Sequence, residues 1–100
     1  MEVPVQMRNL EKYALASEML KAISYPYRLR VLELLEDEEF HAVSEIQEYT
    51  KIEASLLSHH LTKMKDKGII VSHRDGRNIY YKLAIREIIN ILNCIDNCLP

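Results

Sequence analysis

The sequence predicts a mainly α-helical fold that carries one small β-hairpin. Apolar residues recur at helical spacing in five segments, which we place at about residues 5–24, 26–35, 43–50, 53–67 and 85–98. Gly68 follows the fourth helix, and a short apolar run begins directly after it. Asp75-Gly76 then separates two strand-like segments, residues 69–74 and 78–83, and favours a tight turn. The order helix, glycine, strand, turn, strand is that of a winged helix-turn-helix, and 100 residues make one domain.

A proline separates the first two helices. Tyr25-Pro26 ends the first helix, because the residue before a proline avoids the helical region and proline suits a first helical turn. After the second helix, the acidic residues 36–39 are expected to form a solvated loop. The side chains expected to face the core are Leu10, Ala14, Met19, Leu20 and Ile23 in the first helix and Leu29, Val31, Leu32 and Leu35 in the second.

The third and fourth helices form the expected helix-turn-helix. The third directs Ile46 and Tyr49 inward. In the fourth, Leu57, Leu61 and Met64 make one apolar stripe. The opposite face carries hydroxyl, imidazole and ammonium groups, which are the groups that reach phosphates and base edges of DNA. These side chains are Ser55, Ser58, His59, Thr62, Lys63 and Lys67.

The last helix is more apolar than one chain needs. A surface helix requires a single apolar stripe, whereas the apolar residues here lie on more than one face. They are Ile85, Ile88, Ile89, Ile91, Leu92 and Ile95. The chain as a whole is 48% hydrophobic, which is high for a short soluble protein. We therefore expect a second face of this helix to meet another subunit.

Charge is unevenly distributed along the chain. The net charge is −2, but residues 51–82 hold seven Lys and Arg against three Asp and Glu, a balance of +4. A basic segment on an acidic body is typical of a DNA-binding protein with one binding face, and ordinary solvated charge is the alternative interpretation. No apolar run approaches the roughly 20 residues of a membrane span, and the N-terminus has no signal pattern. We therefore expect a cytoplasmic protein without a membrane partner.

The segment from about residue 20 to residue 83 resembles the ArsR/SmtB family of winged-helix transcriptional repressors. The matching pieces follow one another in the family's order over roughly two-thirds of the chain. They are LKAISYPYRLRVLELL at 20–35, VSEI at 43–46, SLLSHHL at 55–61, GII at 68–70 and RDGRNIYYKL at 74–83. The resemblance implies a homodimer, joined through its first and last helices, that binds a palindromic operator in double-stranded DNA.

The resemblance also implies roles for individual residues. Ser55, Ser58 and His59 would read bases, and Lys63 would contact a phosphate. The wing would bring Arg74, Arg77 and Asn78 to the minor groove or to phosphates. Three local alternatives stand beside these roles: Ser55 could only cap its helix, His60 could be a packing histidine, and one of Tyr80 and Tyr81 belongs to the core.

The effector sites of the family lack their ligands in this sequence. The arsenic and cadmium type has two cysteines near the third helix, where this chain has Ala42 and Ser44. The zinc type has ligands near both ends of the last helix, where this chain has Ile85, Glu87 and Cys98. The persulfide type needs a cysteine in the second helix, which has none here. We therefore predict no metal site of these types and no cofactor.

The two cysteines, Cys94 and Cys98, lie one turn apart on the last helix, with Cα atoms roughly 6 Å apart. A disulfide within a regular helix would be strained, whereas two copies meeting at a dimer axis could bridge. Three interpretations are open: packing in an apolar interface, a thiol or redox sensor, and a site for a soft ion such as arsenite or Cu(I). His41 and His73 are expected to be lone surface histidines.

The sequence thus favours a dimeric DNA-binding repressor. A protein–protein interaction module without DNA binding is the alternative, and the acidic net charge favours it. An enzyme is not expected, because the chain has no nucleophile with a partner base, no metal triad and only two glycines with which to build a phosphate loop.

Overall fold

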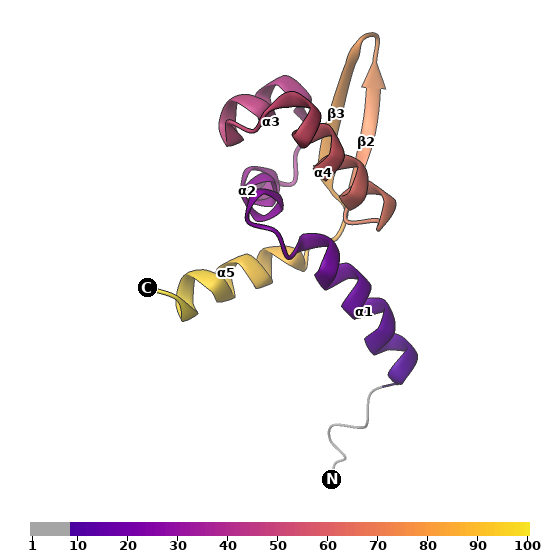
Figure 1. Ribbon diagram of the computed structural model, residues 1–100, viewed down its shortest axis with the longest axis vertical. Coiled ribbons are helices and arrows are strands. Elements are labelled where there is room, and N and C mark those ends of the chain that lie inside the picture. The colour runs from indigo at the N-terminus through magenta and orange to yellow at the C-terminus, as the bar shows by residue number, and fades with distance from the viewer. Residues whose placement is uncertain (1–8) are drawn as a thin grey trace.

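The computed structural model describes residues 9–100, and it has the mainly helical architecture with a β-hairpin that the sequence predicts. Its elements are α1 (Leu10–Ile23), α2 (Pro26–Leu34), the 3-10 turn η1 (Leu35–Asp37), β1 (His41–Ala42), α3 (Val43–Thr50), α4 (Ala54–Asp66), β2 (Ile70–Asp75), β3 (Asn78–Leu83) and α5 (Ile88–Cys98). Figure 1 shows α2, α3 and α4 gathered in the centre, the β2–β3 hairpin projecting from them, and α1 and α5 extending away in different directions.

A single apolar core holds the central helices together. Val31, Leu32 and Leu35 are completely buried, as are Ile46 of α3 and Leu57 of α4. Leu61 and Met64 complete the apolar stripe of α4, so the inward face predicted for this helix is confirmed. Each of these side chains stabilises the fold by about 1.5–3 kcal/mol through removal from water. The opposite face of α4 is therefore fixed toward solvent.

The sheet has three antiparallel strands in the order β1-β3-β2, one more than the sequence predicts. The missed strand is β1, in which His41 pairs with Tyr81 and Ala42 with Tyr80. Tyr81 is buried and Tyr80 is half-buried, as expected for neighbours on a strand. The predicted turn is confirmed: Gly76 has a φ of +65°, a conformation that glycine adopts without steric cost. Strand β2 corresponds to the strand predicted over residues 69–74 and runs one residue later, from Ile70 to Asp75.

Several predicted helix ends are wrong. The first helix begins at Leu10, because Asn9 has extended backbone and its Oδ1 accepts a hydrogen bond from the Glu11 N–H, 2.6 Å away. The earlier part of that prediction, residues 5–8, lies outside the described residues. The second helix ends at Leu34, and η1 then takes up part of the predicted acidic loop. The last helix begins at Ile88 and not at residue 85, since the preceding residues form a turn.

The inward positions predicted for α1 are mostly wrong for a single chain. Only Ala22 and Ile23 of this helix are buried. Of the predicted positions, Leu10 (80% exposed), Ala14 and Leu20 face solvent, whereas Met19 packs partly against the core. Leu15, for which no inward position was predicted, is 74% exposed. The helix therefore presents apolar side chains that no other part of the described chain covers. Across residues 9–100, no helix combines the length and the apolarity that crossing a bilayer requires.

Tyr49 of α3 is a further wrong inward prediction. Its side chain is 44% exposed, and its hydroxyl donates a hydrogen bond to Glu33 Oε1 of α2, 2.9 Å away. A tyrosine can satisfy an apolar pattern with its ring and still place its hydroxyl at the surface.

Candidate nucleic-acid interface

Helix α4, the candidate recognition helix, begins at a carboxylate. Glu53 precedes the helix and accepts hydrogen bonds from the backbone N–H groups of Ser55 (3.0 Å) and Leu56 (3.3 Å). The Ser55 hydroxyl also donates to Glu53 Oε1, 2.7 Å away. These bonds lower the pKa of Glu53 and keep it charged. The alternative that Ser55 caps the helix is wrong, because Glu53 is the capping residue. While its hydroxyl donates to Glu53, Ser55 can still accept a hydrogen bond, but it cannot donate one to a phosphate.

The polar face predicted for α4 is exposed along its whole length. Ser58 and His59 in its middle, and Lys63 and Lys67 toward its end, all face solvent. Hydroxyl and imidazole groups therefore come first along the face and ammonium groups follow. This order suits a helix that places its first turns at base edges and its later turns near phosphates.

The wing supplies further cationic groups. Arg74 lies near the end of β2, Arg77 lies in the turn, and Asn78 begins β3 opposite Asp75. All of these residues are exposed. Figure 1 shows the hairpin standing beside α4 and reaching beyond the helices, so these side chains lie at the outer limit of the molecule.

A buried arginine supports α4 from behind. Arg28 of α2 is only 4% exposed, and its Nε donates a hydrogen bond to His60 Nδ1, 2.8 Å away. Its Nη1 donates to the carbonyl of Ala22, and its guanidinium carbon lies 3.9 Å from the centre of the Tyr25 ring. Burial, the Arg28 charge and His59 lower the pKa of His60, so this imidazole is neutral at pH 7 and protonated on Nε2. The interpretation of His60 as a packing histidine is therefore confirmed.

Comparison with known proteins decides the family. The profile described as "Bacterial regulatory protein, arsR family" matches residues 26–72, from the start of α2 into β2. The chain is 36% identical over 88 residues to the transcriptional repressor SdpR of Bacillus subtilis, with 81% of this chain and 97% of SdpR covered. The chain belongs to the ArsR family.

Two further proteins are similar to this chain in sequence or in structure. The HTH-type transcriptional regulator YgaV of Escherichia coli is 34% identical over 82 residues, with 82% of this chain and 83% of YgaV covered. The crystal structure of NolR from Sinorhizobium fredii superposes with a TM-score of 0.78 at 28% identity, covering 98% of this chain and 96% of NolR. This ArsR-family chain is therefore a helix-turn-helix transcriptional regulator, and not an enzyme.

Sequence reasoning missed a buried histidine in this ArsR-family chain. His41, expected as a lone surface residue, is only 8% exposed. Its Nδ1 lies 2.7 Å from Glu45 Oε2, and its Nε2 lies 2.9 Å from both carboxylate oxygens of Asp37. The expected solvated loop thus contributes a structural carboxylate. Burial opposes protonation of His41, but the hydrogen bonds to Asp37 and Glu45 outweigh it and raise the pKa of the imidazole.

The raised pKa of His41 predicts a pH-dependent contribution to stability. An imidazole whose pKa is raised by folding stabilises the fold fully below its unfolded pKa of about 6.5, and this contribution is lost as pH rises through the folded pKa. We expect His41→Gln to lower the melting temperature by about 4 °C more at pH 6 than at pH 8.5, which corresponds to roughly 1 kcal/mol in a domain of this size. Thermal unfolding followed by circular dichroism measures both differences.

The exposed His73 of the wing provides the control, since it contacts Phe40 but no carboxylate among residues 9–100. The change in melting temperature measured for His73→Gln at each pH is subtracted from that of His41→Gln, which corrects for the loss of a histidine without a carboxylate partner. A His41→Gln difference that does not vary with pH would show that the imidazole is not charged in the folded protein.

The two thiols of this ArsR-family chain share one face of α5, as the sequence predicts. Cys94 and Cys98 are both free and exposed, and their Sγ atoms lie 3.6 Å apart. Within residues 9–100, no three side chains of His, Cys, Asp or Glu converge in a way that could hold a metal ion. The thiols are therefore a pair without a third ligand in the described part of the chain.

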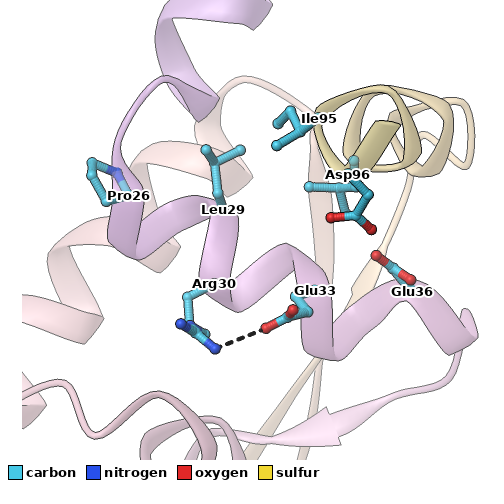
Figure 2. Close-up of a pocket in the computed structure, with 8 residues that line it drawn as sticks. Pro26, Leu29, Arg30, Glu33, Glu36, Ile95 and Asp96 are labelled. Atoms are coloured by element: carbon cyan, nitrogen blue, oxygen red, sulfur yellow. Dashed lines mark hydrogen bonds and ion pairs between the residues drawn. The ribbon is translucent and has the colours of Figure 1, made fainter. Parts of the chain in front are cut away.

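A cavity of about 300 Å³ lies between α2 and α5. Figure 2 shows Leu29 of α2 and Ile95 of α5 on its two sides, and the carboxylates of Glu36 and Asp96 directed toward one another. Arg30 donates to Glu33 across 3.1 Å at its lower edge. No cysteine or histidine lines this cavity, so it offers neither thiol chemistry nor imidazole ligands.

Proposed function

We propose that this ArsR-family regulator is a homodimeric repressor that binds a palindromic operator through α4 and the wing. The observation that carries the proposal is the continuous exposed face of α4, with Ser58, His59 and Lys63 in sequence, beside a wing that holds two exposed arginines. This basic surface belongs to a chain with a net charge of −2, so the cations are concentrated where DNA would lie. The relative SdpR is described as a transcriptional repressor.

The apolar surfaces of α1 and α5 support a dimer. Leu10, Leu15 and Leu20 of α1 are exposed, and Ile91 and Ile95 of α5 are only partly covered. Large apolar side chains left exposed on two helices are typical of a site of protein association. To bind a palindromic site, a two-fold dimer must hold its two α4 helices about 34–36 Å apart, the spacing of successive major grooves on one side of DNA.

Within this proposal the side chains divide into two roles. Ser55, Ser58 and His59 would contact base edges, because they occupy the first two turns of α4. Lys63 and the wing residues Arg74, Arg77 and Asn78 would contact phosphates or the minor groove. The first role gives sequence preference, and the second gives affinity for any DNA.

Fluorescence anisotropy with DNA from upstream of the protein's own gene, against scrambled DNA, tests these roles. We expect His59→Ala to reduce the preference for the specific sequence by about 1–3 kcal/mol, since one base contact is lost. Arg77→Ala should weaken binding to both DNAs by a similar factor and reduce the slope of log K against log salt by about 1.

Arg86→Ala is the matched control for the wing variant. Arg86 is exposed, lies outside the wing and pairs with Glu38 at 3.5 Å, so its loss should leave both affinities unchanged. If the wild-type protein shows no sequence preference and no salt-dependent affinity, the DNA-binding proposal fails and an interaction module replaces it.

A specific observation favours a second activity, a response to oxidants. We infer that Cys94 and Cys98, with Sγ atoms 3.6 Å apart and exposed, form an oxidisable dithiol. With hydrogen peroxide as oxidant, the two thiols lose two protons and two electrons to form one S–S bond, and the peroxide is reduced to two water molecules. Closing the sulfurs to about 2.05 Å within one chain must distort the last turn of α5, whereas a bond to a second copy need not.

Oxidation should therefore lower operator affinity by about tenfold or more in the wild type and leave Cys94→Ser/Cys98→Ser unchanged. Anisotropy before and after mild peroxide treatment measures the effect, and non-reducing gel electrophoresis tells a bond between subunits from one within a chain. Equal affinity in both states would leave the cysteines as packing residues. A response to arsenite in reducing buffer would replace the redox role with a soft-ion site.

A further inference from the structure

A second cavity, of about 330 Å³, lies between α1, α2 and α4 and is rich in positive charge. Its cationic residues are Lys21, Arg28, Lys63 and Lys67, and its acidic residues are Glu18 and Asp66. The lining therefore has a net charge of +2 after both carboxylates are counted. Cations gathered around a hollow repel one another, and an anion in the hollow would relieve that repulsion.

Arg28 is the buried member of this lining. Its guanidinium has five N–H donors, and the described chain provides two acceptors for them, His60 Nδ1 and the Ala22 carbonyl. No carboxylate in residues 9–100 forms an ion pair with it, although Arg28 is buried. A buried cation usually has a counter-ion, so Arg28 beside a cavity points to an anionic occupant.

The exposed members of the lining continue the candidate DNA face. His59, Lys63 and Lys67 are spaced four residues apart and so form one stripe along α4. The stripe begins at a proposed base contact and ends in the cavity. An anion held there would lie beside the recognition face.

A carboxylate of the chain itself already interacts with two of these cations. Glu18 of α1 lies 3.1 Å from Lys67 Nζ and 3.6 Å from Lys21 Nζ. All three side chains are about half exposed or more, and exposed ion pairs of this kind are weak. A stronger or more highly charged anion could therefore displace the Glu18 carboxylate.

We propose that this cavity binds a phosphate group, with Arg28, Lys63 and Lys67 as its ligands and Glu18 as the internal anion that it displaces. A guanidinium and two ammonium groups match the several oxygens and the charge of a phosphate. The phosphate can come from the DNA backbone or from a free phosphorylated molecule. Only the first source rests on the proposed function, and the binding of phosphate itself does not.

Titration of the full chain with inorganic phosphate at constant ionic strength tests the site without DNA. Backbone amide shifts in NMR spectra should change saturably at Lys63, Lys67 and Ala22. The dissociation constant should rise at least fivefold in Lys63→Gln/Lys67→Gln and fall severalfold in Glu18→Gln. Lys65→Gln, an exposed lysine of the same helix outside the cavity, should leave it unchanged.

Amide shifts that do not saturate would overturn the proposal. So would a rise in the dissociation constant of Lys65→Gln as large as that of Lys63→Gln/Lys67→Gln. Because these variants change exposed side chains, unfolding would not obscure the result. The outcome is also independent of operator binding: a protein that binds phosphate but not DNA would refute the repressor and retain this site.

Competition distinguishes the two sources. If a DNA phosphate occupies the cavity, inorganic phosphate will weaken operator binding more than sodium chloride does at the same ionic strength, and Lys63→Gln/Lys67→Gln will lower the salt slope by about 2. If a free phosphorylated molecule is the ligand, phosphate will bind to the operator complex as tightly as to the free protein.

Discussion

Ile91→Asp should convert the protein from a dimer to a monomer and lower its affinity for a palindromic operator by about 100-fold or more. Ile91 packs only partly against the core, so a charge there is tolerated by a single chain but would be buried between two. A dimer binds both half-sites of the operator at once, and linking two binding sites in this way can raise affinity by about 100-fold or more. A monomer loses this gain. Analytical ultracentrifugation and anisotropy measure the two effects.

Asn93→Asp adds the same charge to the same helix and is the matched control. Asn93 is exposed, and at about 100° per residue it lies on the side of α5 away from Ile91. The control should remain dimeric with unchanged operator affinity. If Ile91→Asp also sediments as a dimer, α5 does not form the interface through this face.

Arg28→Met should lower the free energy of unfolding by about 2–4 kcal/mol. The substitution keeps an unbranched side chain of similar length but removes the hydrogen bonds to His60 and to the Ala22 carbonyl, leaving buried acceptors without partners. Urea denaturation measures the change. Arg30→Met, which removes an exposed arginine paired with Glu33, should cost at most about 1 kcal/mol.

A double-mutant cycle with His60→Leu isolates the Arg28–His60 interaction, for which we expect a coupling of about 0.5–3 kcal/mol. Its pH dependence has the opposite sign to that of His41. Folding lowers the pKa of His60, so its contribution is present above the unfolded pKa of about 6.5 and is lost as pH falls through the folded pKa. Additive losses in the cycle would mean that the two side chains only pack near each other.

The elements predicted best are those whose information is local. The stripe of Leu57, Leu61 and Met64 defines α4 within a few turns, and Asp75-Gly76 defines the wing. By contrast, β1 has only two residues, too few to show an alternating pattern, and it exists because His41 and Ala42 meet β3 some forty residues later. Such long-range pairing leaves no pattern in the two residues themselves.

The buried polar residues could not be predicted for a related reason. Arginine usually lies at the surface, and Arg28 is buried through a partner, His60, that lies 32 residues later in the sequence. The partners of His41, Asp37 and Glu45, are each only four residues away, but they meet the imidazole through η1 and β1, two short elements that were not predicted. The exposed leucines of α1 show the converse: an apolar pattern predicts that a side chain will be covered, but it does not tell whether the same chain or another copy covers it. The exposure of the candidate DNA-contact residues on α4 was easier to predict, because it requires only a correct helix phase.

The two hydrogen bonds of Arg28 have a consequence for the length of DNA that the protein can recognise. One side chain of α2 holds the last turn of α1 through Ala22 and the middle of α4 through His60. In a dimer joined through α1, fixing α4 relative to α1 in each subunit would also fix the distance and the angle between the two α4 helices. An operator with one extra base pair between its half-sites would keep every base that the protein contacts and still lose affinity. A base substitution between the half-sites, which leaves their spacing unchanged, would have little effect.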